Sequence, residues 1–213
     1  MKDIREVFRE HQNEEQAAKM ARYMRDQFPF YGLPSPLRKE LEKPYIKEAK
    51  AYFSWEKMDA IYADEHRECQ YFVIDVLKSM KKKLTYEEIE HIKALILDRS
   101  WWDVNDELAK VIGTIGLKDE RVSHLMLEWS CNENLWLRRV SILHQLSFKE
   151  KTNTNLLESI LCANVGSKEI FINKALGWAL RDYSKTDPQF VREILKRYEL
   201  APLTVKEASK YLR

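Results

Sequence analysis

Residues 71–80 read Tyr71-Phe72-Val73-Ile74-Asp75-Val76-Leu77-Lys78-Ser79-Met80. The apolar positions 71, 73, 74, 77 and 80 recur at the spacing of one face of an α-helix. Similar stripes run along most of the chain, for example Ile89, Ile92 and Leu95-Ile96. The pattern predicts a protein built from helices.

The composition agrees with an all-α protein. The 213 residues include only 5 glycines and 6 prolines, whereas sheets and barrels need these residues at many turns. With 33% charged and 45% hydrophobic residues, the chain is predicted to be neither disordered nor membrane-spanning. The start Met1-Lys2-Asp3-Ile4-Arg5-Glu6 lacks the apolar core of a signal peptide. The cysteines Cys69, Cys131 and Cys162 form no CxxC pair, so we expect a soluble cytoplasmic protein.

The helices are expected to form a repeat. Neighbouring pairs span about 30–35 residues, and one pair alone cannot bury its apolar face. We expect successive pairs to stack into a curved solenoid of antiparallel helix pairs, one HEAT-like domain over residues 1–213; an irregular helical bundle is the alternative. The similar pairs are 66–82/86–98, 101–115/120–130, 134–148/152–164 and 168–186/188–198. The expected helices are 2–11, 14–28, 36–50, 55–63, 66–82, 86–98, 101–115, 120–130, 134–148, 152–164, 168–186, 188–198 and 203–212.

Charge is distributed unevenly. Residues 134–213 hold 14 Lys/Arg against 8 Asp/Glu, a net charge of +6, whereas residues 1–133 have a net charge of −4. A basic C-terminal part could present a positive face to nucleic acid. The alternative is an ordinary helical surface of mixed charges.

The common catalytic signatures are absent from the sequence. There is no GxGxxG, GxxxxGK[ST], HExxH or GxSxG motif. The five histidines have no metal-ligand spacing, so we expect neither a metal nor a cofactor.

One candidate site is Ser100-Trp101-Trp102-Asp103-Val104-Asn105-Asp106. Ser100 is predicted to cap a helix, and Asp103 to answer exposed amide groups in the first turn. Trp102 and Asp106 are four residues apart, so an aromatic ring and a carboxylate share one helix face. Together they could hold a cation. The alternative is one buried tryptophan, one surface tryptophan and a solvated aspartate.

A second candidate is Asn134-Leu135-Trp136-Leu137-Arg138-Arg139. Adjacent arginines at the start of a helix point about 100° apart. One could fork onto a phosphate while the other faces solvent. The alternative is a pair of solubilising surface charges.

A third candidate lies in 168–183, where Lys174, Trp178 and Arg181 occupy positions i, i+4 and i+7 of one helix face. A stripe of aromatic and basic residues is typical of a nucleic-acid surface. Gly177 costs this helix up to ~1 kcal/mol relative to alanine, which predicts close approach of a neighbouring helix or a ligand. The alternative is a packed tryptophan flanked by solvated cations.

In this order, the segments resemble the DNA alkylation repair family, the AlkD-type alkylpurine DNA glycosylases built from HEAT-like repeats. The resemblance covers nearly the whole chain, from His11-Gln12-Asn13 to 199–203. Its most specific pieces are Ser-Trp-Trp-Asp at 100–103 with Asp106 beyond it, Trp-Leu-x-Arg at 136–139, and Lys-Ala-x-Gly-Trp-x-Leu-Arg at 174–181.

The resemblance implies an excision site and a DNA-binding surface. The residues implied for excision are Trp102, Asp106 and Trp178. The residues implied for DNA binding are Arg139, Tyr23, Arg181 and Lys174, with Arg139 on the DNA backbone and Tyr23 on the helix expected over 14–28.

The implied substrates are purines alkylated at N3 or N7 in duplex DNA. Their positive charge weakens the N-glycosidic bond, because the base leaves as a neutral species while the sugar gains oxocarbenium character. Asp106 would stabilise this sugar and position or deprotonate water, and the two tryptophans would pack against the cationic nucleotide. No membrane partner is expected, and a monomer is the default. The alternative is a non-catalytic helical-repeat scaffold that binds DNA or protein.

Overall fold

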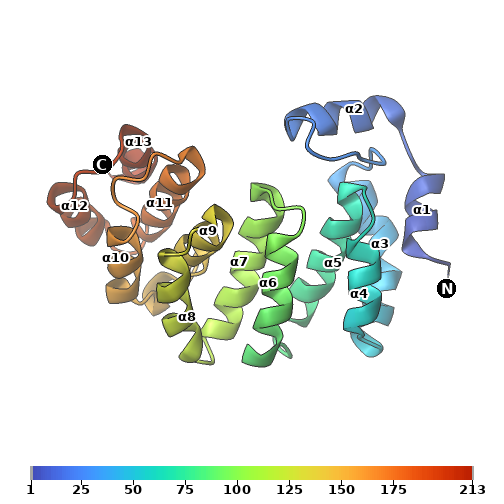
Figure 1. Ribbon diagram of the computed structural model, residues 1–213, viewed down its shortest axis with the longest axis horizontal. Coiled ribbons are helices and arrows are strands. Elements are labelled where there is room, and N and C mark those ends of the chain that lie inside the picture. The colour runs from blue at the N-terminus through green and yellow to red at the C-terminus, as the bar shows by residue number, and fades with distance from the viewer. Residues whose placement is uncertain (1, 213) are drawn as a thin grey trace. The chain divides into compact units, whose positions relative to one another are not determined.

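The computed structural model describes residues 2–212, and this range contains thirteen α-helices, three 3-10 turns and no strand (Figure 1). The all-α prediction is therefore confirmed. The chain divides into two compact units, Met1–Lys81 and Lys82–Arg213. One domain over 1–213, and the curvature of its solenoid, stay predictions. None of the helices described is long and apolar enough to cross a membrane.

The helix boundaries follow the predicted ranges closely at most ends. In the first unit the helices are α1 (Ile4–Glu10), α2 (Glu14–Tyr23), α3 (Ser35–Ala51), α4 (Trp55–Tyr62) and α5 (Arg67–Met80). In the second unit the α-helices are α6 (Ile89–Leu97), α7 (Trp102–Gly116), α8 (Arg121–Ser130), α9 (Leu135–Leu143), α10 (Thr154–Cys162), α11 (Ile170–Tyr183), α12 (Pro188–Arg197) and α13 (Pro202–Ala208). Its 3-10 turns are η1 (Tyr86–Glu88), η2 (Lys149–Lys151) and η3 (Ser209–Tyr211).

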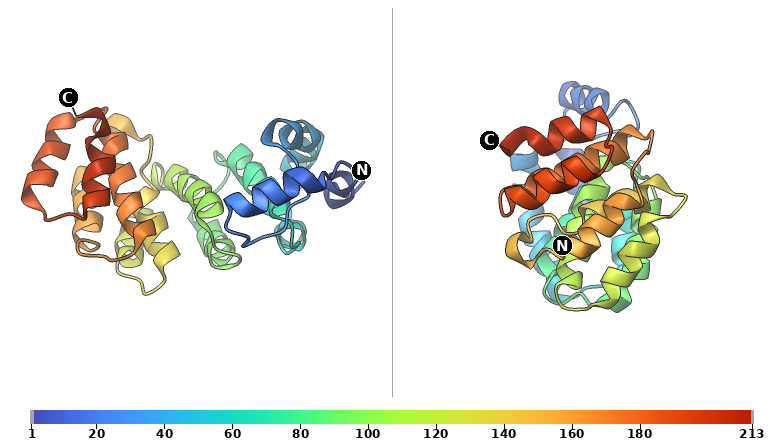
Figure 2. Two further views of the ribbon diagram at one scale, coloured as in Figure 1. Left: turned by 90° about the horizontal axis from the view of Figure 1, so that it is seen from above. Right: turned by 90° about the vertical axis from the view of Figure 1, so that its left-hand side faces the viewer.

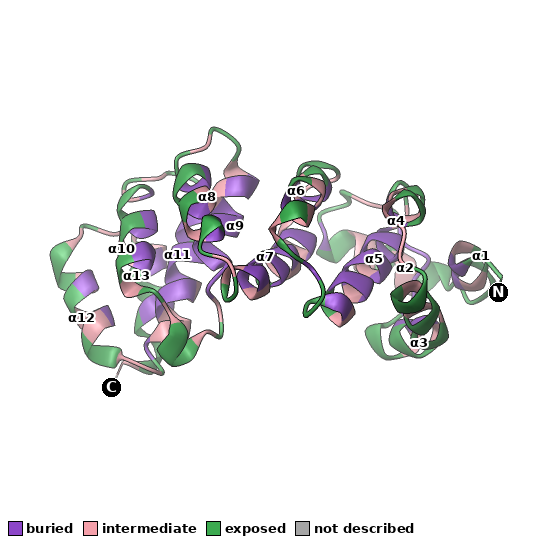
Figure 3. Cartoon of the chain, turned by 90° about the horizontal axis from the view of Figure 1, so that it is seen from below, coloured by how far each residue is buried: buried purple, intermediate pink, exposed green. Residues whose placement is uncertain are grey.

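The first unit is built around α5, on which ten of fourteen residues are buried (Figure 3). Helices α3 and α4 pack against α5, and α1 packs against α3. The buried carboxylate of Glu68 accepts backbone hydrogen bonds from Tyr31, Gly32 and Leu33 at 2.9–3.1 Å. Gly32 has a φ of +86°, and a Cβ there would meet the Asn13 carbonyl oxygen at 2.1 Å, so only glycine fits.

Helix α2 is shorter than expected, because it ends at Tyr23 whereas the apolar pattern predicts a helix over 14–28. Arg25 and Asp26 adopt left-handed backbone conformations with φ of 58° and 55°, and the Asp26 amide closes the helix end on the Ala21 carbonyl. Phe28, which follows this reversal, is partly exposed, and its ring lies 3.9 Å from the guanidinium of the buried Arg67. The apolar pattern therefore continues past the end of the helix into a loop.

The first unit also contains a cluster of buried charges between α3 and α5. Glu42 is fully buried and accepts a hydrogen bond from Arg38, which lies 3.1 Å from Asp75 as well. Burial raises the pKa of Glu42 to about 7, although Arg38 opposes this shift. Two carboxyl groups therefore share one buried guanidinium.

In the second unit α7, α9, α11 and α13 pack one against the next (Figures 1 and 2). Helices α8 and α10 pack against each other and against α9. Stacked helix pairs are therefore present in this unit. The boundary between the units falls inside the first expected pair, 66–82/86–98, because α5 packs with α3 and α4 whereas α6 packs with α7 and α9.

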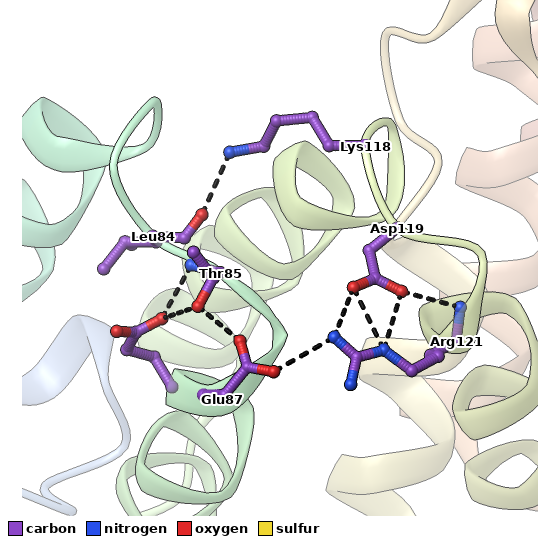
Figure 4. Close-up of polar contacts among 7 residues, drawn as sticks. Leu84, Thr85, Glu87, Lys118, Asp119 and Arg121 are labelled. Carbon is purple, nitrogen blue, oxygen red and sulfur yellow. Dashed lines mark hydrogen bonds and ion pairs between the residues drawn. The ribbon is translucent and has the colours of Figure 1, made fainter.

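Polar contacts join the start of the second unit to the α7–α8 turn (Figure 4). Arg121 forms ion pairs with Asp119 and with Glu87, at 2.6 and 3.1 Å. Lys118 donates a hydrogen bond of 2.9 Å to the Leu84 carbonyl. These contacts fix η1 against the C-terminal end of α7, whereas the motif residues lie at the opposite end of this helix.

Candidate functional site

Helix α7 begins one residue later than the motif predicted. Its N-cap is Trp101, in an extended conformation with φ −156° and ψ 164° and no side-chain capping bond. The prediction that Ser100 caps this helix is therefore wrong: Ser100 Oγ donates to the Ile96 carbonyl of the preceding helix. Asp103 lies in the first turn of α7 as predicted, where a negative charge suits the helix dipole.

Asp106, on the second turn of α7, is held by Arg139 from α9. Arg139 Nε donates to Oδ1 at 2.7 Å and Nη2 donates to Oδ2 at 2.8 Å. The Arg139 side chain is 1% exposed, whereas that of Asp106 is 14% exposed. The carboxylate is therefore oriented by a buried bidentate partner and keeps one edge open to solvent.

Burial is the largest influence on Asp106 and raises the pKa of its carboxyl group. The hydrogen bonds and charge of Arg139 act in the opposite direction. A raised pKa makes this carboxylate a better proton acceptor than an ordinary aspartate. Arg139 at the same time favours the ionised form that such a role requires.

Trp178 on α11 is surrounded by cations. Arg139 lies 5.2 Å, Lys174 5.5 Å and Arg181 5.9 Å from the centroid of its ring. Cations at these distances are attracted by the aromatic ring. The structure thus brings Asp106, Arg139, Trp178, Lys174 and Arg181 into one cluster, which we call the tryptophan cluster.

The two further predicted site residues are Trp102 and Tyr23. Trp102 is partly exposed and precedes Asp106 by four residues on α7, so both project from one helix face. Tyr23 is the last residue of α2 in the first unit and is 72% exposed. Its role in DNA binding stays a prediction.

Arg139 is expected from the sequence to contact DNA phosphate, but its side chain is buried and binds Asp106. Its Nη1 donates to the Phe171 carbonyl on α11, while its Nε and Nη2 donate to Asp106. The predicted phosphate contact would require it to leave or share Asp106, and that contact stays a prediction. Its neighbour Arg138 is partly exposed, which agrees with the expectation that the two side chains point differently.

An aromatic cluster supports the same end of α7, α9 and α11. The Trp101 ring lies 5.7 Å from Trp136 and 5.2 Å from Phe171, and these two rings lie 5.2 Å apart. Aromatic contacts of this kind stabilise packed elements. They hold together the three helices that supply Asp106, Arg139 and the Phe171 carbonyl.

Gly177 confirms the prediction of close approach. A Cβ at this position would lie 2.5 Å from Glu207 Cβ and 3.0 Å from the Thr204 carbonyl oxygen, both on α13. Thr204 Oγ1 also donates to the Asn173 carbonyl at 2.9 Å. The sequence showed that something approaches Gly177 but not that α13 does, and it gave no signal for Glu207, which binds Arg181.

No group of three or more His, Cys, Asp or Glu residues that could hold a metal ion occurs in residues 2–212. The candidate chemistry of the second unit is that of the tryptophan cluster, in which the Asp106 carboxylate and the Trp178 ring lie among Arg139, Lys174 and Arg181.

Comparison with known proteins identifies the family. The family model described as DNA alkylation repair enzyme matches residues 4–212. The chain belongs to this family. No curated protein matches the chain.

Three solved structures are similar to this chain. A predicted DNA alkylation repair enzyme from Enterococcus faecalis is 39% identical, with a TM-score of 0.88 over 94% of this chain and 96% of that one. AlkD2 from Streptococcus mutans is 18% identical, with a TM-score of 0.59 over 80% of this chain and 99% of that one. The protein smu.31 from Streptococcus mutans UA159 is 20% identical, with a TM-score of 0.60 over 83% and 98%. The two Streptococcus mutans proteins show similarity of fold alone.

Proposed function

We propose that this DNA alkylation repair enzyme is a DNA glycosylase that hydrolyses the N-glycosidic bond of N3- or N7-alkylated purines in duplex DNA. The observation that carries the proposal is the pairing of Asp106 with Arg139 beside Trp178. It supplies a partly open carboxylate, held in a defined orientation, next to an aromatic ring.

The chemistry proposed for Asp106 follows from the charge on the substrate. When the bond from C1′ to the base nitrogen breaks, the electron pair neutralises the cationic base and C1′ becomes electron-deficient. Each oxygen of the ionised Asp106 accepts one N–H from Arg139, which leaves further lone pairs for a water molecule. Water adds to C1′ and transfers a proton to the carboxylate. The leaving base needs no general acid, so one carboxylate suffices.

The cations around Trp178 favour the DNA backbone as the partner. Lys174 and Arg181, both on α11, lie within 6 Å of the Trp178 ring, and Lys174 is exposed. Phosphate groups are attracted by lysine and arginine without regard to base sequence. We propose that this surface binds phosphates near the alkylated nucleotide.

Release of free alkylated base from methylated duplex DNA, measured by chromatography, tests the proposal. Wild-type protein is expected to release base, and Asp106→Asn to lose about 100-fold or more in rate because the amide cannot stabilise the cationic sugar. Asp103→Asn on the same helix is the matched control and is expected to keep most of the rate. No release by wild-type protein would favour the non-catalytic scaffold, and equal release by Asp106→Asn would remove Asp106 from the mechanism.

A further inference from the structure

Glu207 on α13 contacts the tryptophan cluster through Arg181. Lys210 foremost, and the Trp178 side chain as well, lower the pKa of the Glu207 carboxyl group. The Glu207 carboxylate accepts a hydrogen bond of 2.7 Å from Arg181 Nη1. Lys210 Nζ lies 2.8 Å from both carboxylate oxygens. The Glu207 side chain is 10% exposed and that of Arg181 is 27% exposed. This ion pair is therefore partly shielded from solvent, which reduces screening.

The backbone geometry holds Glu207 in place. Because residue 177 is glycine, α13 approaches α11 closely enough for Glu207 Cβ to lie 2.5 Å from the position of a Cβ there. The hydrogen bond from Thr204 to the Asn173 carbonyl fixes the same interface one turn earlier. The carboxylate is thus presented to Arg181 by a tightly packed helix pair.

Both arginines beside Trp178 therefore have a carboxylate partner. Asp106 holds Arg139, and Glu207 holds Arg181. Lys174, the third cation near the ring, is exposed. A phosphate group that binds Arg181 must compete with Glu207 for its guanidinium.

We propose that Glu207 is a specificity-determining residue that holds Arg181 beside Trp178 and competes with DNA phosphate for it, which limits binding to unmodified duplex DNA. This inference rests on the proposed function, because it assumes that the surface binds DNA. Asp106 is proposed to act on the sugar, whereas Glu207 acts through Arg181 and touches neither base nor sugar.

The test is a double-mutant cycle read as affinity for an unmodified duplex at fixed salt. Glu207→Gln keeps the side-chain shape and removes the charge, and is expected to bind about five-fold tighter than wild type because Arg181 becomes available. In an Arg181→Ala background the same substitution is expected to raise affinity by less than about two-fold, the effect of the change in net charge alone. A purely structural role for Glu207 would weaken binding.

Glu158→Gln is the matched control, because Glu158 on α10 also forms an ion pair with an arginine, Arg197 on α12. It changes the net charge equally and is expected to raise affinity by less than about two-fold. Equal gains from Glu207→Gln and Glu158→Gln would overturn the inference, as would a gain of about five-fold by Glu207→Gln that persists in the Arg181→Ala background.

Thermal unfolding shows whether Glu207→Gln is folded. If it is not, Glu207→Asp replaces it, because the shorter side chain withdraws the carboxylate from Arg181. A smaller gain that again depends on Arg181 supports the inference, and no gain overturns it. Failure of the wild-type protein to bind DNA would overturn both proposals. If the double-mutant cycle gives the expected affinities but the wild-type protein releases no base, the glycosylase activity alone is overturned.

Discussion

Arg139 holds Asp106 by two parallel hydrogen bonds, so the acid is oriented before any DNA is present. The same guanidinium lies 5.2 Å from the Trp178 ring and binds the Phe171 carbonyl. One buried side chain on α9 thereby connects α7 with α11. The main predictions about the site depend on this connection.

Arg139→Lys is expected to lower base release by about 10- to 100-fold with little loss of DNA affinity, because lysine keeps the charge but cannot form the bidentate contact. Single-turnover base release and binding to unmodified duplex measure the two effects separately. The control is Arg138→Lys, which changes the adjacent, partly exposed arginine. Equal base release by the two variants would show that Arg139 does not position Asp106.

The rate of base release is expected to fall as the pH is lowered, because the ionised form of Asp106 is the active one. Burial raises the pKa of Asp106, so this fall is expected at a higher pH than an ordinary aspartate would give. Arg139 opposes this shift, so Arg139→Lys is expected to move the acid limb of the profile to higher pH. Rates measured from pH 4 to pH 8 test this. An acid limb that is identical in both proteins would contradict it.

The salt dependence of DNA binding tests the phosphate contacts. Lys174→Ala is expected to reduce the slope of log affinity against log salt by about 0.9, the release of one counterion. Arg139→Ala is expected to give the same reduction if its guanidinium leaves Asp106 for a phosphate in the complex. The control is Lys196→Ala on α12, an exposed lysine. An unchanged slope for Arg139→Ala would assign this arginine to Asp106 alone.

Gly177→Ala is expected to destabilise the fold by about 1–3 kcal/mol, because the added methyl group would overlap α13. Its Cβ would meet Glu207 Cβ at 2.5 Å. Gly116→Ala is the matched control, since its Cβ would meet only the Val122 side chain, at 3.1 Å. Denaturant unfolding compares the two variants. Equal stability of Gly177→Ala and wild type would show that α13 can move away without cost.

Glu42 is expected to make the stability of the protein depend on pH. Its pKa is raised to about 7 in the folded protein, so the Glu42 carboxyl group holds its proton more tightly in the folded protein than in the unfolded chain. The resulting stabilisation is present at acid pH and is lost as pH rises through about 7, with a total on the order of 1–3 kcal/mol. Glu42→Gln is expected to lose this dependence, and Glu48→Gln, at an exposed position on α3, to keep it. Free energies of unfolding of the wild type and both variants, measured at pH 5 and pH 8, test this prediction.

The helices of the second unit could be predicted from the sequence because each one buries an apolar stripe with the helical period. Gly177 likewise indicated a close contact. The end of α2 and the cap of α7 could not be predicted, because Phe28 continues the apolar pattern into a loop and Ser100 binds the preceding helix. The helical period of apolar residues shows which positions are apolar, but it does not show where the backbone leaves the helix.

Within the candidate site, the sequence indicated the residues but not their partners. Asp106 and Arg139 are 33 residues apart, and Arg181 and Glu207 are 26 apart. Such pairs depend on how α7, α9, α11 and α13 pack, which local spacing does not contain. The forked guanidinium of Arg139 suits a phosphate, but the sequence does not show that the Asp106 carboxylate faces it.

Glu68 has a consequence for the order of events during synthesis. The amides of residues 31–33 are bound by a carboxylate that follows them by 35 to 37 positions. A ribosome must therefore translate and release α5 before the loop ahead of α3 has its acceptor. Until then the nascent N-terminal segment cannot complete its native hydrogen bonds, however quickly its own helices form.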